Sequence, residues 1–543
     1  MTGATGSLGA HVVARLASDT TISTVYCLVR ARDAAQAAHR VTESLLLRRL
    51  WHTLPLSSRR KLVALPSDLA DPHLGLSDSH YNTIATNLRT VIHCAWSVNF
   101  SMHLSSFEAS NVAGVAHLLA LCRASPRRAA SMNFCSSVST CSRASVTPVP
   151  ESLPELSWAQ GMGYAQSKSV AEHICAKAGD VTCRVLRVGQ IVGDTAHGVW
   201  NAQEAVPMMM QTALTVGALP RLAETPSWLP VDTVAQAVAE ISLSDAGSVF
   251  TNVTNPKTFS WTKDLLPALR NAGLTFDEVE PKEWVRRLRA SNADPKVNPP
   301  IKLVEFFASK YDKDEFAPSK SFATETACSL SAGLTAAPLL DQSFVNKFVQ
   351  YFLNNSWRKP QKTATEKAAI VVAGPCGTGK TAVGNEIAKW LGVPFLEGDF
   401  LHGKSSVDKM RSGEALSDED RESWLARIGT RSKDTVLDLD YQSVVVSCSA
   451  LKKSYRDALR SALNNAGIRT IFVTLQAGKD VLVQRLEGRK GHYMSADMVE
   501  GQLAAQEDAA IEETDVVPVD AEADVQTVLE EIKWLLERVM AME

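Results

Sequence analysis

Short apolar segments alternate with longer amphipathic segments over the first half of the chain. This alternation is typical of a parallel sheet whose strands are joined by helices, so residues 1–255 are predicted to form a doubly wound, Rossmann-like α/β domain. Its predicted strands are residues 25–29, 61–65, 90–94, 130–135 and 181–187.

The pattern changes twice further along the chain. Residues 256–358 hold helical segments separated by stretches rich in Pro, Ser and Thr, which favours a small helical cap. The polar residues 359–366 are predicted to be a linker. A second βα alternation spans residues 367–543 and carries different motifs, so it is not a repeat of the first. Its predicted strands are residues 368–373, 394–397, 443–448, 469–475 and 516–519.

A glycine-rich segment follows the first predicted strand of this second α/β region. Gly374, Gly377, Gly379, Lys380 and Thr381 belong to a phosphate loop of the form GxxxxGK[ST] between a strand and a helix. The glycines let backbone N–H groups surround phosphates, the lysine contacts the outer phosphates and the threonine hydroxyl can ligate Mg²⁺. The sequence therefore predicts binding of a nucleoside triphosphate.

Two polar residues, Asp399 and His402, follow the next predicted strand. Because ligands of open α/β sheets bind beyond the carboxyl ends of the strands, both side chains are expected to face the phosphate loop. We predict that Asp399 accepts the proton of an attacking hydroxyl, a role that contributes about 10²- to 10⁴-fold to a rate. Capping of a helix is the alternative role for an aspartate in this position.

The motifs around these residues resemble the gluconokinase family over residues 367–540. They include Gly-Asp-Phe-Leu-His at 398–402, Cys-Ser-Ala-Leu-Lys-Lys at 448–453 and Arg-Leu-Glu-Gly-Arg-Lys-Gly-His at 485–492. The resemblance implies phosphorylation of D-gluconate to 6-phosphogluconate with ATP and Mg²⁺.

A sugar acid needs cations for its carboxylate and acceptors for its hydroxyls. The residues predicted to bind it are Asp399, His402, Lys409, Arg456 and His492. A basic segment downstream resembles a lid that offsets charge on the transferred phosphoryl group, with a solvated face as the alternative. Its triphosphate-binding members are predicted to be Arg485, Arg489 and Lys490.

A second glycine-rich turn opens the chain. Gly3, Gly6 and Gly9 precede a helical pattern and predict a dinucleotide-binding turn, although such a pattern alone is weak. Arg30 ends the next strand, where an acidic residue would select NAD. We expect Arg30, with Arg40, to pair with the 2′-phosphate of NADP.

Ser137, Tyr164 and Lys168 are the catalytic candidates of this region. Tyr and Lys four residues apart share one face of a helix. Lys168 is expected to lower the pKa of the phenol and to hold the nicotinamide ribose, while Ser137 and Tyr164 polarise a carbonyl.

Further motifs in residues 1–358 resemble the extended short-chain reductases that end carboxylic acid reductases and some peptide synthetases. They include Asp68-Leu69, Asn111-Val112 with Gly114, and Trp-Leu-Pro-Val-Asp at 228–232. The resemblance implies NADPH-dependent reduction of a carrier-bound acyl thioester to an aldehyde, with Asp68 at the cofactor.

This region departs from the dinucleotide-binding pattern at its start. A strand is expected before the first glycine, yet only Met1 and Thr2 precede Gly3. A strand that buries about four large apolar side chains contributes roughly 6–12 kcal/mol, and a typical domain is stable by about 5–15 kcal/mol. We therefore expect an impaired reductase, or a start that lies inside a longer reading frame.

Composition narrows the remaining possibilities. A net charge of -3 gives no reason to expect nucleic-acid or anionic-membrane binding. The longest apolar run, 205–219, is too short to span a membrane. Ten scattered cysteines and the lack of a secretory signal favour reduced thiols in the cytoplasm. The oligomeric state is not indicated.

The favoured function is a gluconokinase with an impaired reductase region in front of it. One alternative is a working thioester or carboxylate reductase, to whose function the fused kinase region is incidental. The other is an NADPH-responsive module that regulates the kinase. Two adjacent genes joined by an erroneous gene model explain the fusion more simply than such regulation.

Overall fold

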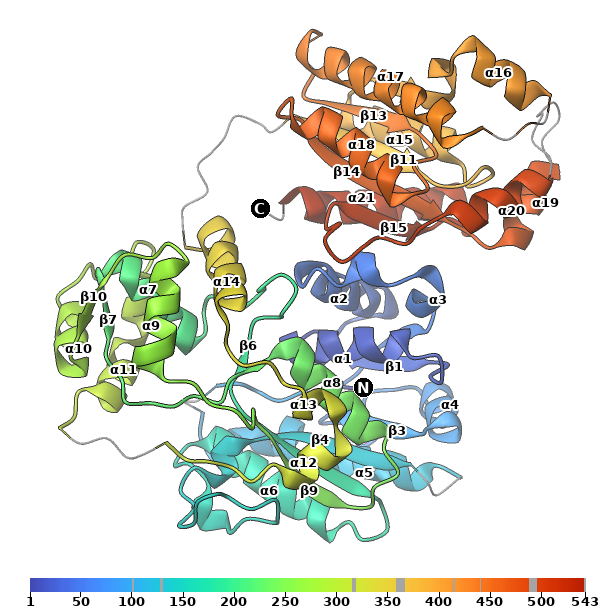
Figure 1. The fold of residues 1–543 in the computed structure, drawn as a ribbon. Coiled ribbons are helices and arrows are strands. Elements are labelled where there is room, and N and C mark those ends of the chain that lie inside the picture. Colours follow the sequence, from blue (N-terminus) through green and yellow to red (C-terminus); the bar gives the residue numbers. More distant parts are fainter. Residues whose placement is uncertain are drawn as a thin grey trace. The chain divides into compact units, whose positions relative to one another are not determined.

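The computed structural model describes residues 1–99, 102–126, 130–314, 319–357, 367–412, 414, 416–439, 441–487 and 496–541. The chain forms two compact units, Met1–Arg48 with Lys61–Lys359 and Arg49–Arg60 with Pro360–Glu543 (Figure 1). The predicted linker, 359–366, lies outside the described residues. The α/β fold class predicted for both regions is confirmed.

The strand pairs of the first unit are all parallel, and most strand residues of its four-stranded sheet are buried, as expected for a sheet covered on both faces. One sheet pairs β1 (Val25–Val29) with β2 (Leu62–Pro66), and the other has the order β3 (Thr90–His93), β4 (Ser131–Ser137), β5 (Cys183–Val188) and β9 (Val249–Val253). Strand β9 was not predicted, because the Thr and Asn in its short sequence weaken the apolar pattern.

Helices cover these strands in two groups (Figure 1). In the first group α1 packs on β1, and in the second group α5 packs on β3. The first group is α1 (Ser7–Ser18), α2 (Ala34–Leu47) and α8 (Val231–Leu243), and the second is α4 (Asp78–Asn87), α5 (Ala113–Ala124) and α6 (Gly163–Lys177).

Only Met1 and Thr2 lie between β1 and β3. Thr2 forms parallel bridges with Leu28 and His93. Its N–H donates to the carbonyl of Ile92 at 3.0 Å, and the N–H of Leu28 donates to the carbonyl of Met1 at 2.9 Å. These two residues join the two halves of the sheet.

The helical cap has its own apolar core. The core joins Trp284, Phe307 and Phe348, which follow the predicted boundary at residue 255, to Trp200 and Met210, which precede it. The cap therefore draws on chain from both sides of that boundary. Its elements are α7 (Ala205–Thr215), β7 (Ala218–Pro220), α9 (Leu266–Asn271), β10 (Asp277–Val279), α10 (Pro281–Arg289), α11 (Val304–Tyr311) and α14 (Gln342–Asn355).

Shorter elements complete the first unit. They are β6 (Ile191–Val192) paired with β8 (Leu229–Pro230), α12 (Glu325–Leu330) and α13 (Ala332–Thr335).

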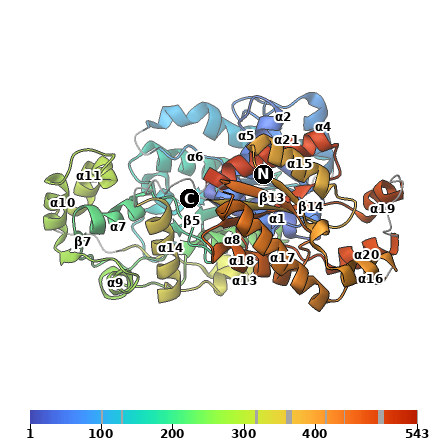
Figure 2. The same ribbon diagram turned by 90° about the horizontal axis from the view of Figure 1, so that it is seen from above.

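The second unit has one five-stranded parallel sheet. Its order is β12 (Phe395–Glu397), β13 (Ser443–Ser447), β11 (Ala368–Ala373), β14 (Arg469–Gln476) and β15 (Val516–Asp520). Figure 2 shows α15 and α21 on one side of this sheet and α17 and α18 on the other. The helices are α3 (Leu56–Arg59), α15 (Lys380–Leu391), α16 (Lys404–Arg411), α17 (Asp418–Leu437), α18 (Lys453–Asn464), α19 (Lys479–Glu487), α20 (Ala496–Ala505) and α21 (Val525–Ala541).

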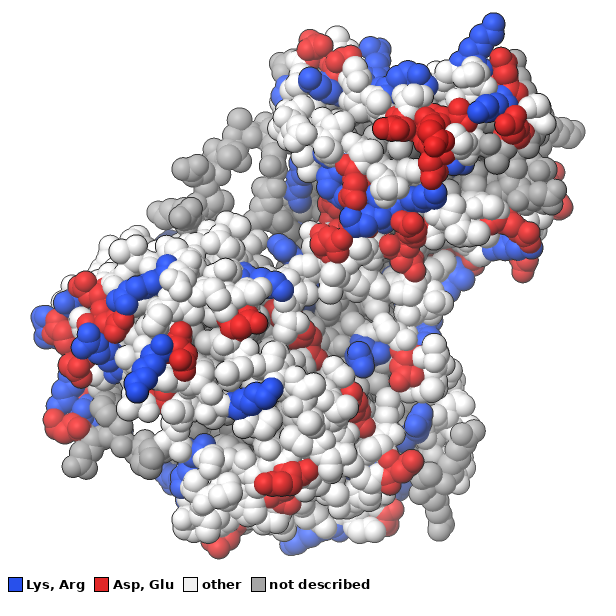
Figure 3. All heavy atoms as spheres, in the orientation of Figure 1, with Lys and Arg blue, Asp and Glu red and all other residues white. Residues whose placement is uncertain are grey.

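Every strand predicted from the sequence is present, and its ends differ from the prediction by at most two residues. None of the described helices is long and apolar enough to cross a bilayer. Figure 3 shows Lys and Arg side chains interspersed with Asp and Glu side chains over the visible face of each unit, in keeping with the small net charge of -3.

Candidate active sites

The phosphate loop of the second unit connects β11 to α15. Gly374, Gly377 and Gly379 adopt positive φ angles of 137°, 83° and 90°. A Cβ atom on Gly374 would lie 2.5 Å from the carbonyl oxygen of Leu475, so no side chain fits there. The glycines are thus required by the shape of the loop, which curls at the N-terminus of a 12-residue helix as a phosphate site demands.

Lys380 begins that helix and its side chain turns back over the loop. Its Nζ donates to the carbonyl of Pro375 at 3.0 Å. Burial lowers the pKa of Lys380, and the negative charge of Asp399 is the largest opposing influence. The predicted base and the phosphate-loop lysine are therefore electrostatic neighbours. Thr381 follows on the first turn of the helix, and its side chain is exposed.

A tight turn after β12 presents Asp399. Gly398 lies so close to β13 that a Cβ atom would be 2.1 Å from the carbonyl oxygen of Ser447. The N–H of Gly398 donates to Ser447 Oγ at 3.2 Å, and Trp424 Nε1 donates to the carbonyl of Gly398 at 2.7 Å. These contacts hold the backbone beside Asp399, while its side chain is exposed.

His402 packs flat on Trp424, with ring centroids 4.2 Å apart and an interplanar angle of 11°. Its Nδ1 is buried and has no hydrogen-bond partner among the described residues. Burial lowers the pKa of His402, and the charge of Asp399 opposes this shift. The neutral ring is thus held next to the predicted base.

The two cations predicted for the sugar acid have different surroundings. Lys409 Nζ forms an ion pair with Asp420 at 2.8 Å and remains partly exposed. Arg456 is buried, with Nη2 2.7 Å from Glu513 Oε2, and it also donates to the carbonyls of Leu451 and Glu507. The prediction for Arg456 is corrected here, because every direction of its guanidinium is occupied inside the domain.

Arg485 lines a cavity of about 260 Å³ beside the phosphate loop, together with Gly377, Val383 and Val528. Its guanidinium is fixed by the carbonyl of Ala521, to which Nη1 donates at 2.6 Å. The other predicted members of the lid, Arg489, Lys490 and His492, lie outside the described residues.

Gln502 contacts the phosphate loop, and no local pattern in the sequence indicates this contact. Its side-chain oxygen accepts the N–H of Cys376 at 2.6 Å. Gln502 lies on α20, far along the chain, and only the packing of that helix brings it to the loop. No group of three or more His, Cys, Asp or Glu side chains suited to a metal ion occurs among the described residues.

The first unit has a cavity of about 390 Å³ over its glycine-rich turn. The residues predicted to bind the dinucleotide come together in its wall: Gly3, Gly6, Gly9, Arg30, Arg40 and Asp68. A Cβ atom on Gly9 would lie 1.9 Å from the carbonyl oxygen of Gly3, and Gly3 has a φ angle of 73°. The turn therefore keeps its compact form although only two residues precede it.

The charged residues of this cavity wall differ in exposure and in their contacts. Arg30 is exposed, and Arg40 Nη1 donates to the carbonyl of Arg30. Asp68 is also exposed, and its Oδ1 accepts the N–H of Ala70 at 3.0 Å.

Ser137, Tyr164 and Lys168 lie close together beyond the end of β4. Burial raises the pKa of Tyr164 to about 12, and a hydrogen bond with Ser137 opposes this shift. Burial lowers the pKa of Lys168 to about 8. Its Nζ donates to the carbonyl of Cys135 at 2.6 Å and lies 5.6 Å from the centre of the Tyr164 ring. The expected lowering of the phenol pKa by Lys168 is not seen, because burial dominates.

Glu172 is a residue of this site that the sequence analysis missed. It lies on α6, four residues after Lys168, and forms a fully buried ion pair with Arg187 at 2.9 Å. Arg187 also donates to the carbonyl of Ser152 at 2.7 Å. The repeated spacing of four residues from Tyr164 was the available signal, because it places all three on one helix face.

The fold and these sites define a phosphate-loop α/β domain of the kinase type, preceded in the chain by a dinucleotide-binding reductase region. Residues 370–512 match a family model described as an AAA domain, and residues 1–238 match one described as Male sterility protein. A Schizosaccharomyces pombe protein named probable gluconokinase is 43% identical over 159 residues, which are 29% of this chain and 81% of that protein. Through this region the chain belongs to the gluconokinase family.

The first unit is similar to reductase domains. The adenylate-forming reductase stbB of Stachybotrys bisbyi is 31% identical over 381 residues, which cover 66% of this chain and 34% of that protein. The chain thus spans about a third of that relative's length. The terminal R domain from the myxalamid biosynthetic pathway superposes with a TM-score of 0.59 at 23% identity, covering 66% of this chain and 91% of that one. This likeness concerns the fold.

Proposed function

We propose that residues 367–543 transfer the γ-phosphoryl group of ATP to D-gluconate and form 6-phospho-D-gluconate. The observation that supports this proposal is that the charge of Asp399 acts on Lys380 at the end of the phosphate loop, in a chain of the gluconokinase family. A base that acts together with a phosphate-binding cation is what an in-line phosphoryl transfer requires.

Each side chain has a proposed task. Asp399 takes the proton of the attacking hydroxyl, and Lys380 together with the N–H groups of the loop offsets charge on the transferred group. His402, held on Trp424, contacts the sugar acid, and Lys409 exchanges Asp420 for the substrate carboxylate. Arg485 forms a wall of the nucleotide cavity.

Thr381 suits the Mg²⁺ that accompanies a nucleoside triphosphate. Its hydroxyl is exposed on the first turn of α15, next to the loop. Mg²⁺ keeps several waters and uses few protein ligands, so a single hydroxyl beside the phosphates is an adequate anchor. When bound, the ion neutralises charge on the phosphates.

The test is turnover of ATP by the full chain with D-gluconate, followed as ADP release. Asp399→Asn is expected to lower kcat by about 10²- to 10⁴-fold, and Lys380→Met to abolish turnover. Asp438→Asn, an exposed aspartate at the end of α17, is the matched control and should retain the parental rate. Turnover with shikimate or AMP but not with gluconate would contradict the assignment.

We also propose that residues 1–358 bind NADPH and retain the residues for reducing an acyl thioester. The cavity of about 390 Å³ that gathers the three glycines with Arg30 and Arg40 supports this second function. Lys168 would hold the nicotinamide ribose, and Ser137 and Tyr164 would polarise the carbonyl. NADPH, when bound, supplies the hydride.

Binding of NADPH, followed by its fluorescence, tests this second proposal. Arg30→Ala is expected to weaken NADPH about tenfold and to leave NADH unchanged, because the arginine pairs with the 2′-phosphate. Arg32→Ala, a neighbouring exposed arginine outside the cavity wall, is the control. Aldehyde formation from a pantetheine thioester would establish a working reductase, and failure of the parental chain to bind NADPH would overturn the proposal.

We further propose a cytoplasmic location. None of the ten cysteines, all of which lie in the described part of the chain, forms a disulfide, which is typical of proteins kept in a reducing compartment.

A further inference from the structure

Helix α17 packs on the turn that carries Asp399 and brings two arginines with it. The ring of His402 stacks on Trp424 of this helix, with 4.2 Å between the ring centroids. Arg421 precedes Trp424 by three residues and Arg427 follows it by three. Residues three apart are neighbours on a helix surface, so the two arginines flank the tryptophan that supports the histidine.

The charges of both arginines act on the predicted site. Burial is the largest cause of the lowered pKa of His402; the charge of Asp399 opposes the shift, and the charges of Arg427 and Arg421 add to it. The predicted base and two cations are thus within electrostatic range of one imidazole. An anionic substrate that enters beside His402 meets these positive charges.

Arg427 has a structural role in this arrangement. Its Nε donates to the carbonyl of Leu401 at 2.8 Å, and its Nη2 lies 3.5 Å from Ser423 Oγ. The same Nη2 lies 3.3 Å from the place that a Cβ atom on Gly403 would take. The guanidinium of Arg427 is therefore turned toward the backbone and fixes the turn on α17.

Arg421 has weaker protein contacts. In the described part of the chain its guanidinium makes one ion pair, with 3.6 Å between Nη1 and Asp418 Oδ1, which is too long for a hydrogen bond. Asp418 is held more closely by Lys452, whose Nζ lies 2.9 Å from Oδ2, and by the hydroxyl of Tyr455. The side chain of Arg421 is 29% exposed. Its N–H donors thus remain available to a ligand.

The next carboxylate along the helix does not compete for Arg421 either. Asp420 Oδ2 lies 2.8 Å from Lys409 Nζ and accepts the N–H of Ser417 at 3.0 Å. This N–H stays with Asp420 when Lys409 turns to a substrate, so Asp420 keeps a partner. The aromatic ring of Tyr455 lies 5.9 Å from the guanidinium carbon of Arg421, close enough for a cation–π contact that limits the motion of the side chain.

We infer that Arg421 binds the carboxylate of the sugar acid through two parallel N–H···O bonds, an assignment that rests on the proposed function. A planar guanidinium matches both oxygens of a carboxylate, whereas the ammonium of Lys409 adds a point charge to the same group. Arg421 thus takes the role that Arg456 cannot fill. A sugar or polyol without a carboxylate leaves this arginine without an anion, so Arg421 determines specificity for acids.

The experiment compares the full chain with three variants, Arg421→Gln, Arg421→Lys and the control Arg431→Gln. Glutamine keeps amide donors but removes the charge, and lysine keeps the charge but removes the fork. Arg431 is an exposed arginine on the same helix. ADP release is measured with D-gluconate varied at saturating ATP, and with ATP varied at saturating gluconate. The thermal midpoint of the second unit is recorded for every version.

Arg421→Gln is expected to raise the KM for gluconate by about 10- to 150-fold, the loss that accompanies removal of a charge-assisted hydrogen bond. The KM for ATP and kcat should change by less than about twofold, because binding is lost equally in the ground and transition states. Arg421→Lys is expected to recover part of the loss, and Arg431→Gln to match the parent.

An unchanged KM for gluconate in Arg421→Gln would overturn this assignment and leave gluconate phosphorylation intact. A rise in the KM values of both substrates together with a lower thermal midpoint would show a structural role and also overturn it. Failure of the parental chain to phosphorylate gluconate is a separate result, because it overturns the proposed function and this assignment with it.

Discussion

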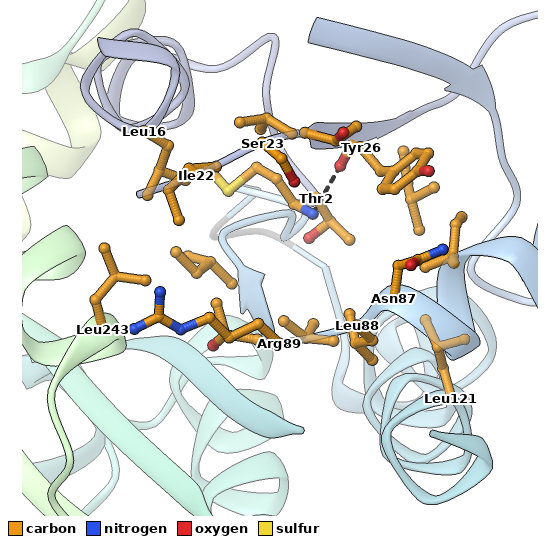
Figure 4. A pocket seen from close by; sticks show the side chains of 18 of the residues that line it. Thr2, Leu16, Ile22, Ser23, Tyr26, Asn87, Leu88, Arg89, Leu121 and Leu243 are labelled. Carbon is orange, nitrogen blue, oxygen red and sulfur yellow. Dashed lines mark hydrogen bonds between the residues drawn. The ribbon is translucent and has the colours of Figure 1, made fainter. Parts of the chain in front are cut away.

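The two glycine-rich turns of this chain have the same kind of local geometry and very different support. The phosphate loop follows β11, whose six residues are all buried and which pairs with β13 and β14. The turn at Gly3 follows two residues that bridge β1 and β3 beside a cavity of about 480 Å³ lined by both strands (Figure 4). Both turns are nevertheless closed, with Gly3 in the first and Gly374, Gly377 and Gly379 in the second at positive φ. A glycine pattern thus determines the turn, whereas the preceding strand determines how firmly the sheet around it is held.

The largest expected effect concerns the stability of the second unit, in which a full strand precedes the glycine-rich turn. Arg456→Met leaves Glu513 buried without its main partner, which should lower the free energy of unfolding of the second unit by about 3–5 kcal/mol. Arg460, 3.1 Å from Glu513, compensates in part and favours the lower end of this range. Urea unfolding of the second unit measures the loss.

A double variant, Arg456→Met with Glu513→Met, separates structure from substrate binding. Removal of both charges is expected to restore most of the stability, because no unpaired charge stays buried. The KM for gluconate should then equal that of the parent. A raised KM in a stable double variant would show that Arg456 binds the substrate.

A pair of leucine truncations compares the packing of the two units directly. Leu459 is fully buried in the core that contains β11, and Leu459→Ala is expected to cost about 3–5 kcal/mol in the second unit. Leu121 is buried too but borders the cavity of about 480 Å³ between β1 and β3, so Leu121→Ala should cost only about 2–3 kcal/mol in the first unit. Denaturant titration resolves the two transitions, and equal costs would show that this cavity does not loosen the packing around it.

The smallest expected effect is a pH dependence confined to the first unit. Burial holds the pKa of Lys168 near 8, so its ammonium form is lost as pH rises above that value. NADPH-dependent reduction should therefore fall by up to about tenfold per pH unit above 8, while gluconate phosphorylation should not follow this profile. Initial rates between pH 7 and pH 10 provide the measurement.

Stability should change in the opposite direction over the same range. Because the pKa of Lys168 is lower in the folded than in the unfolded chain, the folded state binds fewer protons between about pH 8 and pH 10.4, and the first unit gains stability as pH rises. Lys168→Arg keeps the charge and should remove the alkaline fall in rate. A fall that persists in this variant would assign the titration to another group.

Much of both folds was predictable because strand and helix patterns are local. The apolar runs at β1 and β11 were predicted to the residue, and the order of motifs identified both regions. The phosphate loop with Lys380 and Asp399, and the cavity wall with Arg30, followed from fixed positions at the ends of parallel strands. These features depend on residues close in the sequence or on a topology that parallel sheets share.

Contacts between residues far apart in the sequence were not predictable in the same way. Arg456 has the charge expected of a carboxylate-binding residue, but its partner Glu513 lies 57 residues further along the chain. Gln502 reaches Cys376 across 126 residues. No local spacing encodes such pairs, because they depend on how helices pack against loops from distant parts of the chain.

The sequence by itself determined the two glycine turns and the strands that follow or precede them, since these are properties of neighbouring residues. Only the tertiary structure decided that the guanidinium of Arg456 is paired inside its own domain, and that Glu172 forms a buried ion pair with Arg187. The physical reason is that burial and charge pairing are set by groups that approach through space, and these determine which side chains remain free to act.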